Sequence, residues 1–102
     1  ASSAQSNVAG NWIVGEQNTV IKIKQEGSVY SGRIISSDNS KAEIGKLMVQ
    51  DLKKNKKGNW EGQIYSPKRK EWYDAEFTPK GEILEINISV GFFSKTMEWK
   101  KQ

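Results

Sequence analysis

The sequence predicts an all-β fold, an eight-stranded antiparallel up-and-down β-barrel. Apolar and polar residues alternate along most of the chain, no segment sustains a helical period, and turn signals recur about every ten residues. Two runs also echo each other, 29–36 and 59–66, since both contain aromatic, any, Gly, any, Ile, any, Ser. A glycine between large residues on one strand face favours a sharp bend or a close approach. That pattern suits a curved, closed sheet.

Eight segments carry the alternation, in this order: 11–14, 19–25, 28–36, 45–53, 58–65, 71–78, 83–90 and 96–100. The first begins after Gly10, and the second ends at Glu26-Gly27, where the glycine can take a positive φ in a tight hairpin. Asp38-Asn39-Ser40 is a loop by composition and separates the third segment from the fourth. Each of the first four segments is therefore expected to be a separate strand.

The later breaks have equally simple reasons. The polar turn 54–58 closes with a glycine, and Ser66-Pro67 favours turn initiation. Pro79-Lys80-Gly81 places proline and glycine where a type I or type II turn needs them. The last break falls at 91–95, a stretch that contains Phe92 and Phe93.

Sorting the strands by face predicts closure. One face collects most of the large apolar residues: Trp12, Val14, Ile21, Ile23, Tyr30, Ile34, Leu47, Val49, Trp60, Ile64, Tyr73, Ala75, Phe77, Leu84, Ile86, Ile88, Val90, Met97 and Trp99. The other face is polar, which is the pattern of an antiparallel meander. A flat sheet would leave the apolar face in water, whereas a barrel buries it and removes both edges.

Composition indicates one domain, 10–102, preceded by a disordered mature N-terminus at 1–9. The small, polar opening of the chain is typical of a segment left after signal-peptide removal, so we expect a secreted or periplasmic protein. Histidine and cysteine are both absent, which removes the commonest general base, the thiolate nucleophile and the commonest zinc ligands. No apolar stretch reaches transmembrane length. We expect a monomer that is not an enzyme, with no cofactor and no metal.

The two ends of such a barrel are expected to differ. Successive loops alternate between the ends, so the short turns at 26–27, 54–58 and 79–81 share one end. The longer connections at 15–18, 37–44, 66–70 and 91–95 share the other. We expect the end with the longer connections to be the mouth of any cavity.

Several motifs resemble known families. Gly10-Asn11-Trp12 resembles the G-x-W that opens lipocalins and other calycins. In that superfamily the Trp plugs the closed end of the barrel beside a basic residue of the last strand, which implies Lys100 or Lys101 here, with Trp99 nearby. A closer resemblance is to a family of small secreted bacterial proteins, domain of unknown function 2147. It rests on the following segments: Gly10-Asn11-Trp12, Val20–Ile23, Gly27–Ile34, Gly45-Lys46-Leu47, Gly62–Pro67 and Thr96–Lys100.

This resemblance covers nearly the whole chain from Gly10 and implies a lipocalin-like fold and an extracytoplasmic location. The chain departs from the family pattern at Ser66, where an Asp is usual, at Lys100, where an Arg is usual, and at Glu85-Ile86-Asn87. No established activity comes with the family.

The candidate ligand site is the lumen, lined by Tyr30, Gly32, Ile34, Trp60, Gly62, Ile64, Tyr73, Phe77 and Ile86. Eight strands enclose an interior that side chains either fill or leave open for one small ligand. The large residues favour a filled lumen, and Gly32 and Gly62 favour space. Trp72 shares a face with Asp74 and Glu76, so it is the candidate for a surface contact.

Two functions remain open. The first is binding of a small hydrophobic or amphipathic molecule inside the barrel. The second is a ligand-free interaction module whose basic loops, 53–57 and 68–70, contact an anionic envelope component or a protein partner. The net charge of +4 suits an anionic surface. No specific nucleic-acid binding is expected, because the polar face mixes acids with bases.

Overall fold

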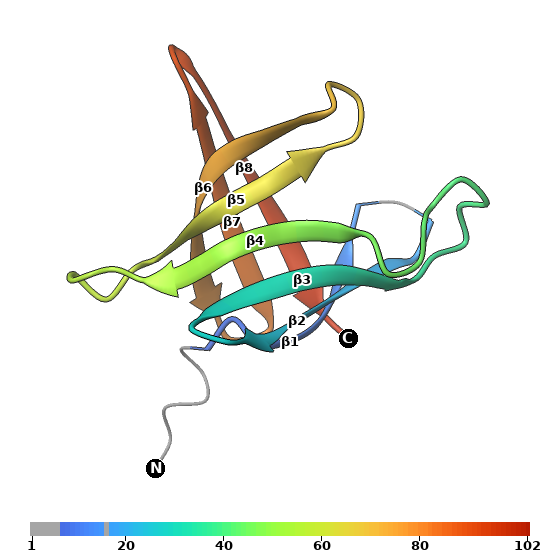
Figure 1. Cartoon of the computed structure of the whole chain (residues 1–102), viewed down its shortest axis with the longest axis horizontal. Helices are drawn as coiled ribbons and strands as arrows, with labels where there is room; N and C mark the ends of the chain where they lie inside the picture. The colour runs from blue at the N-terminus through green and yellow to red at the C-terminus, as the bar shows by residue number, and fades with distance from the viewer. Residues whose placement is uncertain (1–6, 16) are drawn as a thin grey trace.

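The computed structural model shows a closed barrel of eight antiparallel strands joined in sequence order (Figure 1). It describes residues 7–15 and 17–102. The strands are β1 (Gly10–Val14), β2 (Thr19–Glu26), β3 (Val29–Ser36), β4 (Leu47–Lys54), β5 (Trp60–Ser66), β6 (Glu71–Lys80), β7 (Ile83–Val90) and β8 (Phe93–Lys101). The predicted all-β barrel is confirmed, and each expected strand is present with ends shifted by at most a few residues.

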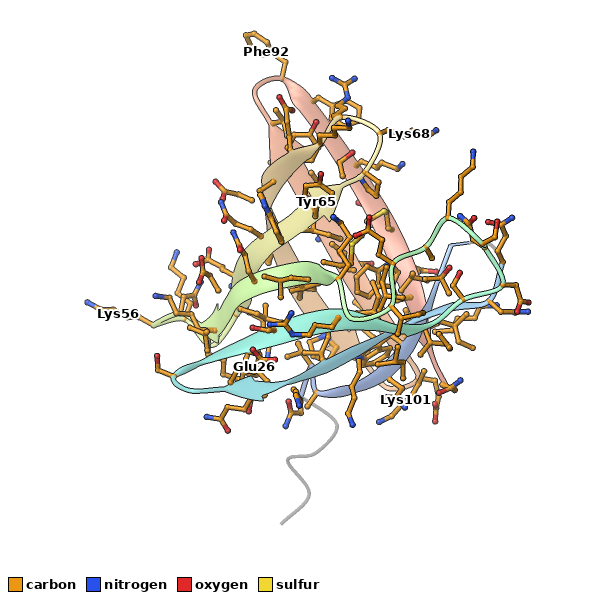
Figure 2. All side chains as sticks on the ribbon, turned by 45° about the vertical axis from the view of Figure 1, so that its right-hand side comes forward. Glu26, Lys56, Tyr65, Lys68, Phe92 and Lys101 are labelled. Atoms are coloured by element: carbon orange, nitrogen blue, oxygen red, sulfur yellow. The ribbon has the colours of Figure 1, made fainter. Side chains whose placement is uncertain are left out.

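The largest difference lies at the last hairpin. We expected a loop over 91–95, but β7 and β8 pair up to Val90↔Phe93, and Gly91 at φ 59° helps to form a tight turn with Phe92. The strand β8 therefore begins at Phe93. The β7–β8 hairpin is a long arm with Phe92 at its tip (Figure 2).

The interior is packed with apolar side chains. Its fully buried members include Trp12, Ile21, Ile23, Val49, Leu52, Phe77, Leu84 and Ile86. All but Leu52 belong to the face that the alternation of the sequence predicts to point inward. These side chains form one hydrophobic core inside the barrel.

Leu52 points inward because β4 contains a bulge. Asp51 and Leu52 both lie opposite Gly62, between the pairs Gln50↔Gln63 and Lys53↔Glu61, and Asp51 has a φ of 56°. One extra residue reverses the side-chain alternation from that point on. Strict alternation along β4 therefore predicts the wrong face for Leu52.

The bulge yields a prediction about Asp51. A β-branched residue tolerates the left-handed region poorly, so Asp51→Val is expected to lower the free energy of unfolding by about 1–2 kcal/mol. Asp51→Asn is the matched control, because asparagine adopts this conformation readily, and it should unfold at the same urea concentration as the parent. Equal destabilisation by both variants would show that the carboxylate, and not the backbone conformation, is what matters.

The fold also includes residues before Gly10. We expected a disordered segment over 1–9, of which 1–6 lie outside the described residues. Val8, however, is fully buried and belongs to the core. Its carbonyl oxygen accepts a hydrogen bond from Nε1 of Trp12 at 2.9 Å. The packed domain thus begins by Val8, and the expected boundary at Gly10 is two residues late.

The barrel has two unlike ends. The closed end carries the short turns that follow β2 and β6, and the β4–β5 turn that contains Lys56. The opposite end, which we call the mouth, carries the β5–β6 turn with Lys68, the β7–β8 turn with Phe92 and the longer β3–β4 connection. Figure 2 shows Lys56 far from Lys68 and Phe92. Over the described residues, no helix has the length and apolarity that crossing a bilayer requires.

Candidate functional site

Trp12 and Trp99, which the lipocalin resemblance implies as a plug of the barrel, are both buried. Trp12 is 1% exposed, and Nζ of Lys101 lies 5.9 Å from the centroid of its ring. The lysine nearest the Trp12 ring is therefore Lys101, and both Lys100 and Lys101 are exposed. Trp99 is buried and meets Phe77 edge-on, with ring centroids 6.4 Å apart. A role of Trp12 and Trp99 as a plug of the barrel stays a prediction, and of the two lysines that the resemblance implies, Lys101 is the one near the Trp12 ring.

The middle of the barrel, where the sequence placed a lumen, is filled. The two echoed aromatics, Tyr30 and Trp60, meet there in a T-shaped contact with centroids 5.1 Å apart. Ile34, Phe77 and Ile86 are buried in the same core. These five candidate lumen residues therefore belong to one hydrophobic core or pack against it, and they line neither of the two concavities described below.

Neither echoed glycine has room for a side chain, although Gly62 borders the outer concavity described below. A Cβ built on Gly32 would lie 3.0 Å from Cγ2 of Ile21 and 3.0 Å from Cβ of Val49. A Cβ on Gly62 would lie 2.9 Å from Cα of Leu52 and 3.0 Å from the carbonyl oxygen of Gln50. Both glycines allow close approach of a neighbouring strand, one of the two roles that the sequence pattern offered.

A pocket of about 560 Å³ opens at the mouth. It lies between the inner faces of β5–β8 and the β5–β6 turn, and its lining residues are Ile64, Tyr65, Ser66, Pro67, Lys68, Arg69, Tyr73, Ile88, Val90, Phe93, Lys95 and Met97. Two of the predicted lumen residues, Ile64 and Tyr73, belong to it. The expectation that the longer connections surround the mouth agrees with this location.

The pocket exists because β5–β8 extend beyond their neighbours. The registered pairs between β4 and β5 end at Val49↔Ile64, so Tyr65 and Ser66 pair with β6. At the other side, β8 pairs with β1 at Lys100 and Lys101, and its earlier residues pair with β7. Near the mouth, β5 therefore has no registered partner in β4, and β8 has none in β1, so the recess is open on these two sides.

The wall and the rim of this pocket differ in character. Ile64 and Ile88 are buried at its base, and Met97 is half-buried. Lys68, Arg69 and Lys95 are exposed at the rim, and none of them forms an ion pair with a carboxylate of the described residues. The arrangement is an apolar recess bordered by positive charge. The sequence pointed to the basic loop 68–70 but not to its combination with Lys95 and the recess, because Lys95 comes from a distant strand.

Tyr73 supplies a polar group within the recess. Its hydroxyl donates a hydrogen bond to Oε2 of Glu71 at 3.0 Å. Partial desolvation, together with the neighbouring Glu71 carboxylate, raises the pKa of Tyr73 above its ordinary value. The phenol is therefore neutral at physiological pH, and its single proton is used in the hydrogen bond to Glu71.

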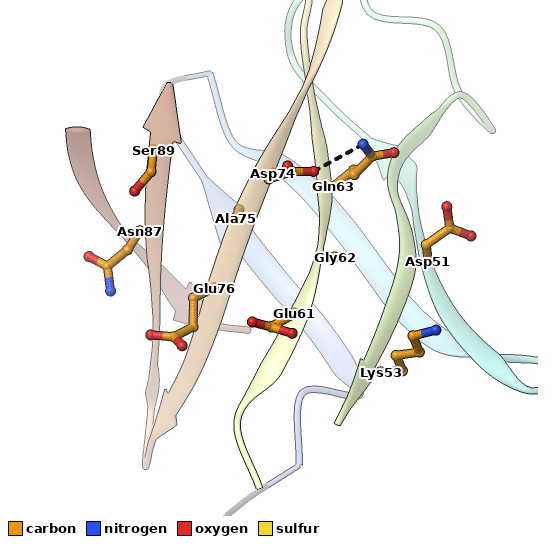
Figure 3. Close-up of a pocket in the computed structure, with 10 residues that line it drawn as sticks. All are labelled: Asp51, Lys53, Glu61, Gly62, Gln63, Asp74, Ala75, Glu76, Asn87 and Ser89. Carbon is orange, nitrogen blue, oxygen red and sulfur yellow. Dashed lines mark hydrogen bonds between the residues drawn. The ribbon is translucent and has the colours of Figure 1, made fainter. Parts of the chain in front are cut away.

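A second concavity, of about 610 Å³, lies on the outer wall over β4–β7 (Figure 3). Polar and charged side chains line it, including Asp51, Glu61, Asp74 and Glu76. Gln63 donates to Oδ1 of Asp74 at 3.1 Å. Ligand sites are usually enclosed and largely apolar, so the mouth pocket is the better candidate. Among the described residues, no group of three acidic side chains is arranged to hold a metal ion.

Trp72, the predicted surface contact, is half-buried on the outer wall. Its ring lies against Tyr65, directly across the β5–β6 ladder, with centroids 5.2 Å apart. Nζ of Lys46 lies 4.8 Å from the centroid of Tyr65. These contacts account for Trp72 as a cross-strand pair that covers the outside of the mouth.

Comparison with known proteins agrees with the sequence motifs. No curated protein and no solved structure matches the chain. The family described as uncharacterized proteins conserved in bacteria, domain of unknown function 2147, matches residues 10–101. That range spans all eight strands of the barrel. The chain therefore belongs to this bacterial family.

Proposed function

We propose that the protein binds a small amphipathic molecule with an anionic head group, in the mouth pocket. The observation that carries the proposal is an apolar recess of about 560 Å³ bordered by Lys68, Arg69 and Lys95. Binding sites for small ligands have volumes of roughly 300–1,000 Å³ and combine apolar walls with a few convergent polar groups. The mouth pocket has both properties.

The direction of binding follows from the two parts of the pocket. An apolar tail is expected to enter first, against Ile64, Ile88 and Met97, because burying both surfaces removes apolar area from water. The head group then remains at the rim, where an anion accepts charge-assisted hydrogen bonds from the three cations. Because the hydrophobic core occupies the rest of the interior, the ligand is expected to stay in the part of the barrel next to the mouth.

A fluorescent fatty acid, dansylaminoundecanoic acid, tests the proposal directly. Its fluorescence is expected to rise on mixing with the protein and to fall when unlabelled laurate displaces it. Dodecanol, which has the same chain without the charge, is expected to compete less well. Absence of binding, or equal competition by the acid and the alcohol, would contradict the proposed site.

Charge reversal at the rim is the matched variant experiment. Arg69→Glu combined with Lys95→Glu is expected to weaken binding of the dansyl acid by about tenfold, or about 1.4 kcal/mol. The control, Lys56→Glu with Lys57→Glu, makes the same change in net charge at the closed end and should leave the affinity unchanged. Equal losses in the two double variants would point to a non-specific effect of net charge.

A further inference from the structure

The tip of the β7–β8 arm is apolar and fully exposed. Phe92 has a relative exposure of 113%, Phe93 of 59% and Val90 of 41%. Three of the five large hydrophobic side chains that are exposed among the described residues thus lie within 90–93. Isolated exposed apolar residues are common, but a cluster at the most projecting point of a molecule marks a contact surface.

The arm holds this tip away from the barrel. Residues from Phe93 onward pair with β7, whereas β1 joins β8 only at its last two residues, Lys100 and Lys101. Val90 and Phe93 form the final pair of the hairpin, so their side chains lie beside each other below Phe92. Figure 2 shows Phe92 at one extreme of the molecule, clear of the other labelled residues.

Four cations lie at the same end of the barrel as the tip. Lys68, Arg69 and Lys70 occupy the adjacent β5–β6 turn, and Lys95 lies on the arm itself; all four are exposed. Over 66–71 and 89–95 the only acidic residue in the sequence is Glu71, and its carboxylate accepts the Tyr73 hydroxyl hydrogen bond. None of the four cations pairs with a carboxylate of the described part of the chain.

The closed end provides an internal comparison. Its β4–β5 turn is also basic, with Lys53, Lys54, Lys56 and Lys57, but 53–59 contains no apolar residue. We call the four cations at the mouth, Lys68, Arg69, Lys70 and Lys95, the collar. Among the described turns, an apolar tip and such a group of cations therefore occur together at the mouth alone. An apolar tip with exposed cations at the same end of the molecule suits the surface of a bilayer that contains anionic lipids, because the tip can enter the acyl region while the cations contact the head groups.

We propose that the mouth end docks on an anionic lipid bilayer, with Phe92 entering the interfacial region and Lys68, Arg69, Lys70 and Lys95 over the head groups. In this orientation the mouth pocket opens toward the bilayer. The proposal goes beyond ligand binding and stands without it, since neither the exposure of Phe92 nor the collar depends on what the pocket holds.

Co-sedimentation with vesicles tests the docking. The protein is expected to sediment with vesicles of phosphatidylglycerol and phosphatidylcholine, and to remain in solution with phosphatidylcholine alone. Added salt should weaken binding, because it screens the collar. Phe92→Ser is expected to reduce vesicle binding at least tenfold, and Lys68→Glu with Arg69→Glu should do the same. The control Lys56→Glu with Lys57→Glu should bind as the parent does.

Because the chain has no cysteine, a single labelled thiol can report insertion. Phe92→Cys carrying an environment-sensitive fluorophore should shift to the blue with anionic vesicles, whereas Lys56→Cys with the same label should not. Phe92 does not line the pocket, so Phe92→Ser should still bind the dansyl acid, which separates this test from that of the proposed function. Failure to bind anionic vesicles, equal binding to neutral ones, or self-association that Phe92→Ser abolishes would overturn the proposal.

Discussion

Replacing Trp12 with alanine is expected to lower the free energy of unfolding by about 3–5 kcal/mol. The side chain is 1% exposed and belongs to the core, so its removal leaves a cavity between β1 and the rest of the core. The Val8 carbonyl oxygen also loses the hydrogen bond from Nε1 of Trp12. Small domains have a total stability of roughly 5–15 kcal/mol, so this loss is a large share. Urea denaturation followed by circular dichroism measures it.

Two companion variants separate the causes. Trp12→Phe keeps most of the ring but lacks the donor, so it should cost clearly less than alanine. Trp72→Ala removes the same side chain from a half-buried position on the outer wall, where the loss should also be smaller. If Trp72→Ala and Trp12→Ala unfold at the same urea concentration, the buried Trp12 side chain contributes no more to the free energy of unfolding than the half-buried Trp72 does.

Alanine at Gly62 is expected to cost about 1–3 kcal/mol, and alanine at Gly32 to cost less. At Gly62 the added methyl group would meet backbone atoms, Cα of Leu52 at 2.9 Å and the Gln50 carbonyl oxygen at 3.0 Å. At Gly32 it would meet the side chains of Ile21 and Val49. Side chains can move by a few tenths of an ångström more easily than paired strands can.

The two glycines serve as controls for each other, because they occupy matching places in the echoed motif. Urea denaturation of both alanine variants should give the order parent, Gly32→Ala, Gly62→Ala in decreasing stability. A neutral Gly62→Ala would mean that the bulge in β4 relaxes freely. The reverse order would mean that packing against Ile21 and Val49 is the tighter constraint.

Much of the fold could be predicted from local chemistry. Alternating faces gave the inward positions of most strands, and Gly27 and Gly81 marked turns where a positive φ is needed, at 73° and 67°. What escaped was set by contacts between distant segments. The bulge at Asp51 depends on which residues of β5 lie opposite, and Val8 becomes a core residue because the Trp12 ring lies within reach.

The candidate site was predictable in outline only. The sequence indicated the end of the barrel at which the mouth pocket opens and two of the residues that line this pocket, Ile64 and Tyr73. The candidate lumen lay deeper in the barrel than this pocket does, because a glycine in a strand signals either a gap or a close approach, and the neighbouring strand decides which. The three cations at the rim of the pocket, Lys68, Arg69 and Lys95, come together only when β8 folds back beside the β5–β6 turn.

The seam between β1 and β8 has a consequence for how the chain reaches its native state. Two registered pairs, Trp12↔Lys101 and Ile13↔Lys100, join segments that are almost the full chain length apart. The other neighbours are consecutive in sequence, so they form hairpins without closing a long loop. Closure of the seam is therefore expected late in folding, after most of the meander has assembled. Because only two registered pairs join β1 to β8, the seam is also expected to open first. Opening there leaves the consecutive strands paired as an open sheet.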